Sequence, residues 1–126
     1  ILEALGPDVP LHFTAFHPDY RMLDHRPTPP ATLTRARQIA LANGLRYVYT
    51  GNVRDESGGS TWCPGCGALV IGRDGYEITA WNLESHLDKS ACAACGTRIP
   101  GRFEARPGNW GARRQPVRLS TFAEPA

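Results

Sequence analysis

The sequence predicts a mixed fold in which an α/β segment precedes a small all-β domain. Two observations support this order. The first fifty residues contain two apolar, β-rich runs on either side of a helical pattern. All four cysteines follow them, in two Cys-x-x-Cys pairs. We therefore expect an α/β segment over residues 1–57, a cysteine-containing domain over 58–104, and an extended or disordered tail over 105–126.

Two short strands bound the α/β segment. Residues 10–16 (PLHFTAF) form an apolar run that predicts the first strand. Residues 17–30 are rich in proline and aspartate and predict a long loop. Residues 45–50 (LRYVYT) are β-branched and aromatic, which predicts the second strand.

A helix is predicted between these strands. Thr28 has the side chain of an N-cap, and Pro29 would occupy the first helical position. Asn43-Gly44 predicts the end of the helix in a left-handed cap. Apolar side chains at helical spacing predict a buried face formed by Leu33, Ala36, Ile39 and Ala40.

The order strand, helix, strand is that of one right-handed crossover in a parallel sheet. Two strands and one helix leave strand edges unpaired and apolar faces uncovered. We therefore expect this unit to be the end of a larger α/β domain or to be covered by a partner.

A hairpin is predicted between the two cysteine pairs. Residues 51–60 are polar and rich in glycine, which is typical of a loop or linker. Asp74-Gly75 lies between β-rich runs at 68–73 and 76–81, a strong signal for a two-residue turn. Trp62, Trp81 and Phe103 are interpreted as the small core of this domain.

The cysteines predict a four-thiolate metal site at Cys63, Cys66, Cys92 and Cys95. Four ligands leave no open position for water, so the site is predicted to be structural. Two disulfides or a redox motif are the alternatives. Disulfides need an oxidising compartment, and no apolar signal segment is visible to send the chain there. A redox motif needs only one Cys-x-x-Cys pair. Zinc is preferred over iron, although four thiolates in a tetrahedron suit both ions.

Composition gives few indications of partners. The formal charge of +2 is too small to predict binding to nucleic acid or an anionic membrane. No apolar run reaches transmembrane length, and free thiolates suit a reducing compartment, so we expect a cytoplasmic protein. The first residue is Ile1 and the first methionine is Met22, which suggests a fragment or a processed product.

Four stretches carry a resemblance to a known family. These are PLHFTAFHPDYRMLD, PTPPATLTRARQIALANGLRYVYTGNV, TWCPGCGALVIGRDGYEI and CAACGTRIPGRF, which lie within residues 8–104. They resemble the C-terminal part of the AmmeMemoRadiSam-system radical SAM enzymes, which are similar to pyruvate formate-lyase activating enzymes. Many ribbon domains share the cysteine pairs, so these alone do not make the resemblance specific. The stretches that make it specific are HFTAFHPDY, GLRYVYTGNV and CGTRIPG.

The resemblance implies a partial (β/α) barrel that holds a [4Fe–4S] cluster and S-adenosylmethionine, followed by a zinc-ribbon or rubredoxin-like domain. Reduction of the cluster cleaves S-adenosylmethionine to a 5′-deoxyadenosyl radical, which abstracts hydrogen from a substrate. Residues 1–57 would supply the last β-α-β elements of that barrel. Ligands of barrels meet the carboxyl ends of the strands, so His12, Thr14, Phe16 and His17 are candidate cofactor- or substrate-binding residues.

The sequence departs from this family in one large respect. The cluster-binding motif Cys-x-x-x-Cys-x-x-Cys is absent, and we therefore predict that this chain alone is inactive. Its partners would be the missing N-terminal portion of the barrel and a protein substrate. The alternative is a free-standing zinc-ribbon module for nucleic acid or a protein partner, with the basic tail formed by Arg102, Arg106, Arg113, Arg114 and Arg118.

Overall fold

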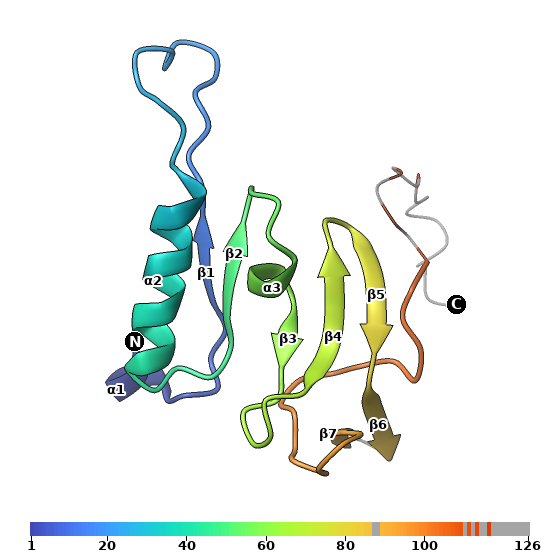
Figure 1. Cartoon of the computed structure of the whole chain (residues 1–126). Coiled ribbons are helices and arrows are strands. Elements are labelled where there is room, and N and C mark those ends of the chain that lie inside the picture. The colour runs from blue at the N-terminus through green and yellow to red at the C-terminus, as the bar shows by residue number, and fades with distance from the viewer. Residues whose placement is uncertain (87–88, 110, 112, 114–115, 117–126) are drawn as a thin grey trace, which may run out of the picture.

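The computed structural model describes residues 1–86, 89–109, 111, 113 and 116. The elements are α1 (Leu2–Leu5), β1 (Leu11–Thr14), α2 (Pro30–Ala42), β2 (Val48–Gly51), α3 (Glu56–Gly59), β3 (Thr61–Trp62), β4 (Leu69–Asp74), β5 (Glu77–Trp81), β6 (Leu83–His86) and β7 (Lys89–Cys92). In Figure 1 the β-α-β half and the cysteine-containing half lie next to each other. Much of the predicted tail, including Arg114 and Arg118, lies outside the described residues.

The predicted β-α-β order is confirmed. β1 and β2 pair in parallel, with Leu11 opposite Val48 and His12 opposite Tyr49. Helix α2 packs against one face of this pair, where Ala40, Leu45 and Val48 form a buried cluster. No further strand pairs with β1 or β2 in the described part of the chain, so the partial barrel stays a prediction.

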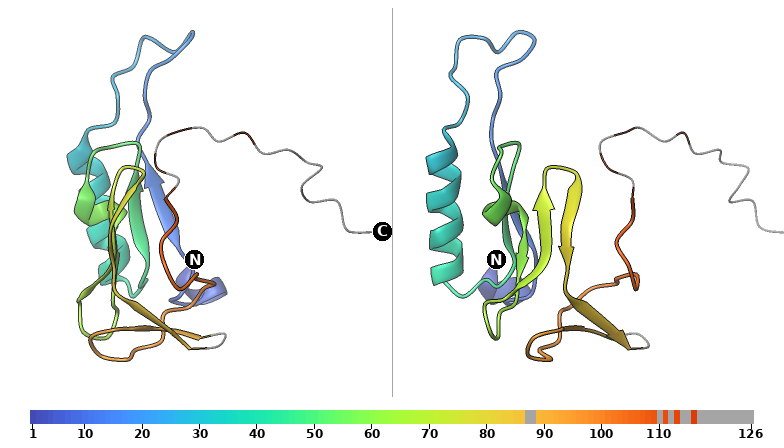
Figure 2. Two further views of the ribbon diagram at one scale, coloured as in Figure 1. Left: turned by 90° about the vertical axis from the view of Figure 1, so that its right-hand side faces the viewer. Right: turned by 45° about the vertical axis from the view of Figure 1, so that its right-hand side comes forward.

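The start of α2 differs from the prediction. The helix begins at Pro30, and its N-cap is Pro29 rather than Thr28. The Thr28 hydroxyl instead accepts a hydrogen bond from the Phe16 amide at 2.9 Å, which ties the two ends of the loop over residues 15–29 together. That loop extends beyond the carboxyl end of β1 (Figures 1 and 2).

The buried face of α2 is narrower than its apolar pattern predicted. Leu33 and Ala40 are buried and Ala36 is half-buried, but Ile39 is 53% exposed. The predicted stop is confirmed, because Gly44 follows the C-cap with a φ of 103° that disfavours other residues.

The segment predicted as a linker is an anchored turn. Asp55 caps the short helix α3, accepting hydrogen bonds from the Gly58 amide and the Thr50 hydroxyl at 3.0 Å each. A side chain at Gly58 would overlap Thr50 and Asp55, so the close packing requires glycine here. Residues 51–60 thus hold the end of β2 against the start of β3.

The second half contains one predicted and one unpredicted hairpin. β4 and β5 are antiparallel, but Asp74 pairs with Glu77, so the turn is Gly75-Tyr76, one residue later than predicted. β3 joins the edge of β4. A second hairpin, β6–β7, turns away from the direction of β5 and leads into the second cysteine pair (Figure 2).

The core of this half is shared with the first half. Val70, Ile71 and Ile99 are at most 1% exposed, and Tyr47 from the segment before β2 packs among them. Trp81 and Phe103 pack against this cluster, as predicted, and their rings meet in a T-shaped contact with centroids 6.3 Å apart. Trp62 is not part of this cluster. It is 36% exposed, and its indole donates to the Ser57 carbonyl.

Candidate metal centre and neighbouring cavities

The two cysteine pairs adopt the same backbone conformation. In each pair the amide of the first cysteine donates to the carbonyl five residues later, at 2.8 Å in the first pair and 2.9 Å in the second. The amide of the glycine after the second cysteine donates back to the first cysteine, at 2.9 and 2.8 Å. Gly67 and Gly96 share a φ of 74°, which explains why glycine follows each pair. The two turns therefore present their sulfurs from the same backbone conformation.

The four sulfurs form one cluster. All lie within 4.8 Å of one another, with Sγ–Sγ distances of 3.6 Å for Cys63–Cys95 and 3.8 Å for Cys66–Cys92. A tetrahedral ion with metal–sulfur bonds of about 2.3 Å has edges of about 3.8 Å. A disulfide would require about 2.05 Å, and all four cysteines are free. The geometry therefore fits a four-thiolate metal site and argues against disulfides.

The electrostatics of the cluster favour a cation. The Thr97 hydroxyl, 3.1 Å from Cys95 Sγ, and the Thr97 amide lower the pKa of Cys95 to about 6. The Ala68 amide lowers the pKa of Cys66, but the neighbouring sulfurs and desolvation outweigh it and raise this pKa to about 11. Thiolates at this separation repel one another, and a bound metal ion removes that repulsion.

A close contact joins the two cysteine turns. Gly65, inside the first turn, lies against the Thr97 side chain of the second, and a methyl group there would overlap the Thr97 hydroxyl. Cys63 and Cys92 are buried, whereas Cys66 and Cys95 reach the surface. Sequence reasoning missed Thr97, because its role depends on the approach of two turns that are distant in sequence.

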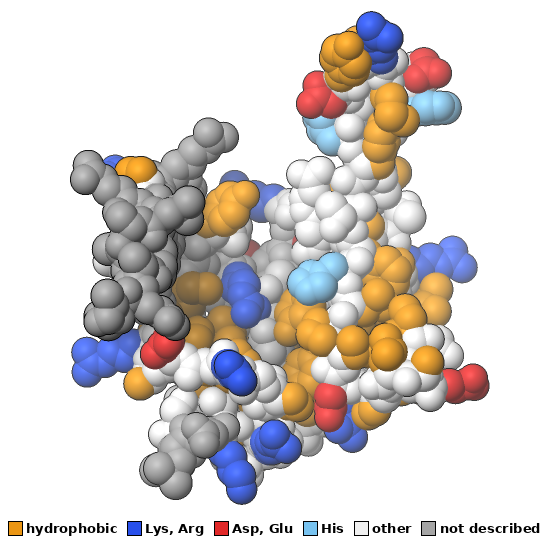
Figure 3. Space-filling view, turned by 180° about the vertical axis from the view of Figure 1, so that it is seen from behind, with side chains coloured by type: hydrophobic (Ala, Val, Ile, Leu, Met, Phe, Trp, Pro, Cys, Tyr) orange, Lys and Arg blue, Asp and Glu red, His pale blue; other side chains and the backbone are white. Residues whose placement is uncertain are grey.

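The predicted cofactor-binding residues do not converge on one site. His12 and Thr14 lie on the exposed face of β1, away from α2, which is the side seen in Figure 3. The His12 ring stacks on Tyr49 with centroids 5.0 Å apart. Phe16 is half-buried beyond the strand, and His17 is exposed in the loop.

A cavity of about 920 Å³ lies between this strand pair and the β4–β5 turn. Of the four predicted residues, only His12 lines it. Arg73 enters it from β4, with its guanidinium 5.8 Å from the Tyr49 ring and Nη1 donating to Thr61 at 2.8 Å. Sequence reasoning missed Arg73, because its contacts come from three elements that only folding brings together.

Asn52 links the carboxyl ends of β1 and β2 at the edge of this cavity. Its backbone has a φ of 58°, and its side-chain amide donates to the Ala15 carbonyl at 2.9 Å. The positive φ and the conformational tolerance of asparagine are consistent with a strand end that bends sharply. Asn52 therefore fixes the spacing of the two strand ends.

Comparisons with known proteins give one informative match. An uncharacterized protein of Methanocaldococcus jannaschii is 44% identical over 99 residues, which are 79% of this chain and 29% of that protein. The chain therefore spans less than a third of the length of this relative. No family model and no solved structure matches the chain.

None of the described helices is long and apolar enough to cross a bilayer.

Proposed function

We propose that residues 1–57 supply the last β-α-β elements of a radical SAM barrel of the activating-enzyme type, and that residues 58–104 are its structural zinc ribbon. One observation carries the proposal. His12 and Thr14 lie on the face of a parallel strand pair that α2 leaves uncovered. In a (β/α) barrel the face opposite the helices lines the interior, and ligands bind at the carboxyl ends of the strands.

The proposed reaction belongs to the complete protein. The family chemistry is hydrogen abstraction by a 5′-deoxyadenosyl radical, begun by a [4Fe–4S] cluster. The four cysteines of this chain all lie in the ribbon, so they do not fit that cluster, and its three thiolates would come from outside these residues. The length of the M. jannaschii relative leaves room for such a portion.

Within that protein, residues of this chain would shape the cavity. His12 and Tyr49 form a stacked pair on its wall, and Asn52 holds the strand ends at a fixed spacing. Arg73 extends the wall from the ribbon. The ribbon would thus support the barrel end as well as fold itself.

Zinc is the proposed ion of the four-cysteine site. Four thiolates complete a tetrahedron and leave no position for water or substrate, which suits a structural role. Elemental analysis of the purified protein tests this directly. One zinc per chain is expected, whereas one iron with the visible absorption of a tetrathiolate centre would replace the zinc assignment.

The free-standing ribbon module has weaker support. Tyr47 is part of the ribbon core, and the Tyr49 hydroxyl lies 2.9 Å from Thr61 Oγ1. A ribbon that shares its core with a β-α-β unit is not an independent binding domain. Salt-dependent binding of DNA or RNA by this chain would favour the module instead.

The deciding experiment uses the complete product of the gene that encodes these residues. After anaerobic reconstitution and reduction, we expect the electron paramagnetic resonance signal of a [4Fe–4S] cluster and formation of 5′-deoxyadenosine from S-adenosylmethionine. The Cys92→Ser variant should retain the cluster signal, because the ribbon cysteines are not its ligands. A complete product that contains no such cluster would contradict the proposal.

A further inference from the structure

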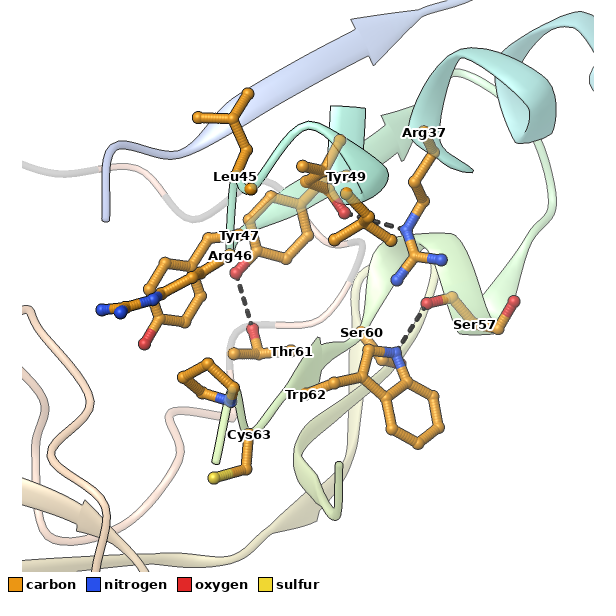
Figure 4. Close-up of a pocket in the computed structure, with 14 residues that line it drawn as sticks. Arg37, Leu45, Arg46, Tyr47, Tyr49, Ser57, Ser60, Thr61, Trp62 and Cys63 are labelled. Atoms are coloured by element: carbon orange, nitrogen blue, oxygen red, sulfur yellow. Dashed lines mark hydrogen bonds between the residues drawn. The ribbon is translucent and has the colours of Figure 1, made fainter. Parts of the chain in front are cut away.

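A second cavity lies on the helix side of β2, where α2 faces α3, β3 and the first cysteine turn (Figure 4). Its volume is about 510 Å³, within the range of sites for small molecules. Arg37 and Trp62 form two of its walls, and Leu45 and Val48 contribute to its apolar lining. We refer to it as the Arg37 cleft. His12 does not line it, and Tyr49 is the one residue that it shares with the cavity between the strand pair and the β4–β5 turn.

Arg37 brings a positioned guanidinium group into this cleft. Its Nε donates to the Val48 carbonyl at 2.9 Å, which holds the planar group against β2. In Figure 4 the guanidinium points from α2 toward Ser57 and Trp62. No residue in the described part of the chain accepts a hydrogen bond from its two terminal nitrogens or pairs with it as an ion.

The charge of Arg37 is not neutralised within the cleft. None of the residues that line it is an aspartate or glutamate, and Cys63, which also lines it, is one of the four candidate metal ligands. The positive charge of Arg37 lowers the pKa of the Asp55 carboxylate, but this carboxylate already accepts hydrogen bonds from Thr50, Ser57 and the Gly58 amide. The other cation of the lining, Arg46, pairs with Asp8 at 3.0 Å. Arg37 is therefore the group available for an incoming anion.

Trp62 supplies a flat apolar wall. Its side chain is 36% exposed, and its indole nitrogen donates to the Ser57 carbonyl at 2.9 Å, which fixes the ring orientation. An aromatic surface beside a guanidinium accommodates a ligand that has both a planar apolar part and an oxyanion.

We propose that the Arg37 cleft binds a small molecule in which a carboxylate or phosphate is attached to an aromatic or similarly flat apolar group. The oxyanion would accept paired hydrogen bonds from the terminal nitrogens of Arg37, a geometry that guanidinium and oxyanion share. The apolar part would lie along Trp62 above Leu45 and Val48. This inference does not depend on the proposed radical chemistry.

The test is a titration of the metal-loaded 126-residue chain, followed by the nuclear magnetic resonance signal of the Trp62 indole N–H. The probes are phenyl phosphate and phenylacetate, with inorganic phosphate and benzyl alcohol as partial ligands. We expect both aryl oxyanions to shift the signal saturably, with a Kd at or below about 1 mM. Inorganic phosphate and benzyl alcohol should each bind at least about ten-fold more weakly. The stronger of the two aryl probes identifies the preferred oxyanion.

Variants separate the two parts of the site. Arg37→Gln should weaken phenyl phosphate binding at least about ten-fold, whereas Arg35→Gln, on an exposed position of the same helix, should not change it. In the Trp62→Leu variant, phenyl phosphate should bind no more tightly than inorganic phosphate. Backbone amide shifts measure both affinities in this variant. An unchanged metal content and melting temperature shows that each variant is folded. Equal binding of benzyl alcohol and phenyl phosphate, no saturable binding, or an unaffected Arg37→Gln variant would overturn the proposal.

Discussion

The β-α-β half and the ribbon half bury their side chains in different ways. In the ribbon, two hairpins and two cysteine turns surround Val70, Ile71 and Ile99, which are at most 1% exposed. In the β-α-β half, one helix covers one face of two strands, and Ile39 remains 53% exposed. Two of the four cysteines, Cys63 and Cys92, are themselves part of the first core, whereas the second has a core on one face only.

The shared boundary shows how the two halves depend on each other. Tyr47 belongs to the segment that enters β2, yet its ring is buried among ribbon residues. Burial raises the pKa of Tyr47 to about 12. The ribbon therefore supplies part of the packing that the β-α-β half lacks.

Removal of the metal should produce the largest difference between the halves. A structural zinc site contributes on the order of 10 kcal/mol to folding, more than a small ribbon gains from its core. We expect a strong chelator, or the Cys92→Ser substitution, to unfold residues 61–103 and abolish the dispersed amide signals of Val70 and Ile71. Zinc should restore those signals after chelation. A ribbon that keeps them without metal would contradict a structural site.

The contact between the cysteine turns gives a smaller effect inside the ribbon. Gly65→Ala forces a methyl group into Thr97 and should destabilise the folded protein by about 1–3 kcal/mol, as overpacking does. Gly59→Ala is the matched control, because nothing approaches that position and it should change stability by less than about 1 kcal/mol. Urea unfolding of the metal-loaded chain measures both values. An equal loss of unfolding free energy in the two variants would mean that the two cysteine turns are not in close contact at Gly65 and Thr97.

These two predictions rest on features that differ in how visible they are in the sequence. The spacing of four cysteines alone indicates the metal site, because two Cys-x-x-Cys turns can supply a tetrahedron. The β-α-β order follows from apolar patterns and from the Asn43-Gly44 stop. The Gly65–Thr97 contact has no sequence signal, because the two turns meet only after the hairpins between them have formed.

The missed elements have equally specific causes. Residues 83–92 (LESHLDKSAC) are mostly polar and lack a turn signal, so the β6–β7 hairpin was not predicted. Either of the consecutive prolines at 29 and 30 could have occupied the first helical position, so the helix start was predicted one residue too early. The hydroxyl of Thr28 accepts a hydrogen bond from the Phe16 amide instead of capping the helix. Residues 51–60 have the composition of a linker, yet Asp55 organises them, because a single carboxylate can cap a turn that glycine makes compact.

Substitutions of Asp55 test how much that turn contributes to the stability of the protein. Asp55→Ala removes the cap of α3 and should destabilise the protein by about 0.5–2 kcal/mol at pH 7. Asp55→Asn retains a capping oxygen and should be closer to the original protein. Thermal unfolding compares the three proteins. Equal melting temperatures of the alanine and asparagine variants would show that the cap contributes nothing.

The same residue predicts a pH dependence. Hydrogen bonds from the Gly58 amide and, after it, from Thr50 and Ser57 outweigh desolvation and lower the pKa of Asp55 below 3.8. A carboxylate with a lowered folded pKa stabilises the fold above its unfolded pKa, and this contribution disappears as the pH falls through the folded value. We expect the stability that the original protein gains over Asp55→Asn from this carboxylate to shrink below about pH 4. A difference that is constant from pH 7 to pH 3 would contradict the lowered pKa.

The smallest predicted effect concerns the hydrogen bond that crosses the boundary. Tyr49→Phe removes the hydroxyl that lies 2.9 Å from Thr61 Oγ1 but keeps the ring that stacks on His12. One such bond contributes about 0.5–1.5 kcal/mol, so urea unfolding should show a loss of that size. Tyr76→Phe is the matched control, because the Tyr76 side chain is 78% exposed and should show no measurable change. If Tyr49→Phe also behaves as neutral, the Tyr49–Thr61 hydrogen bond does not hold the halves together, and the packing of Tyr47 in the ribbon core is the larger contribution.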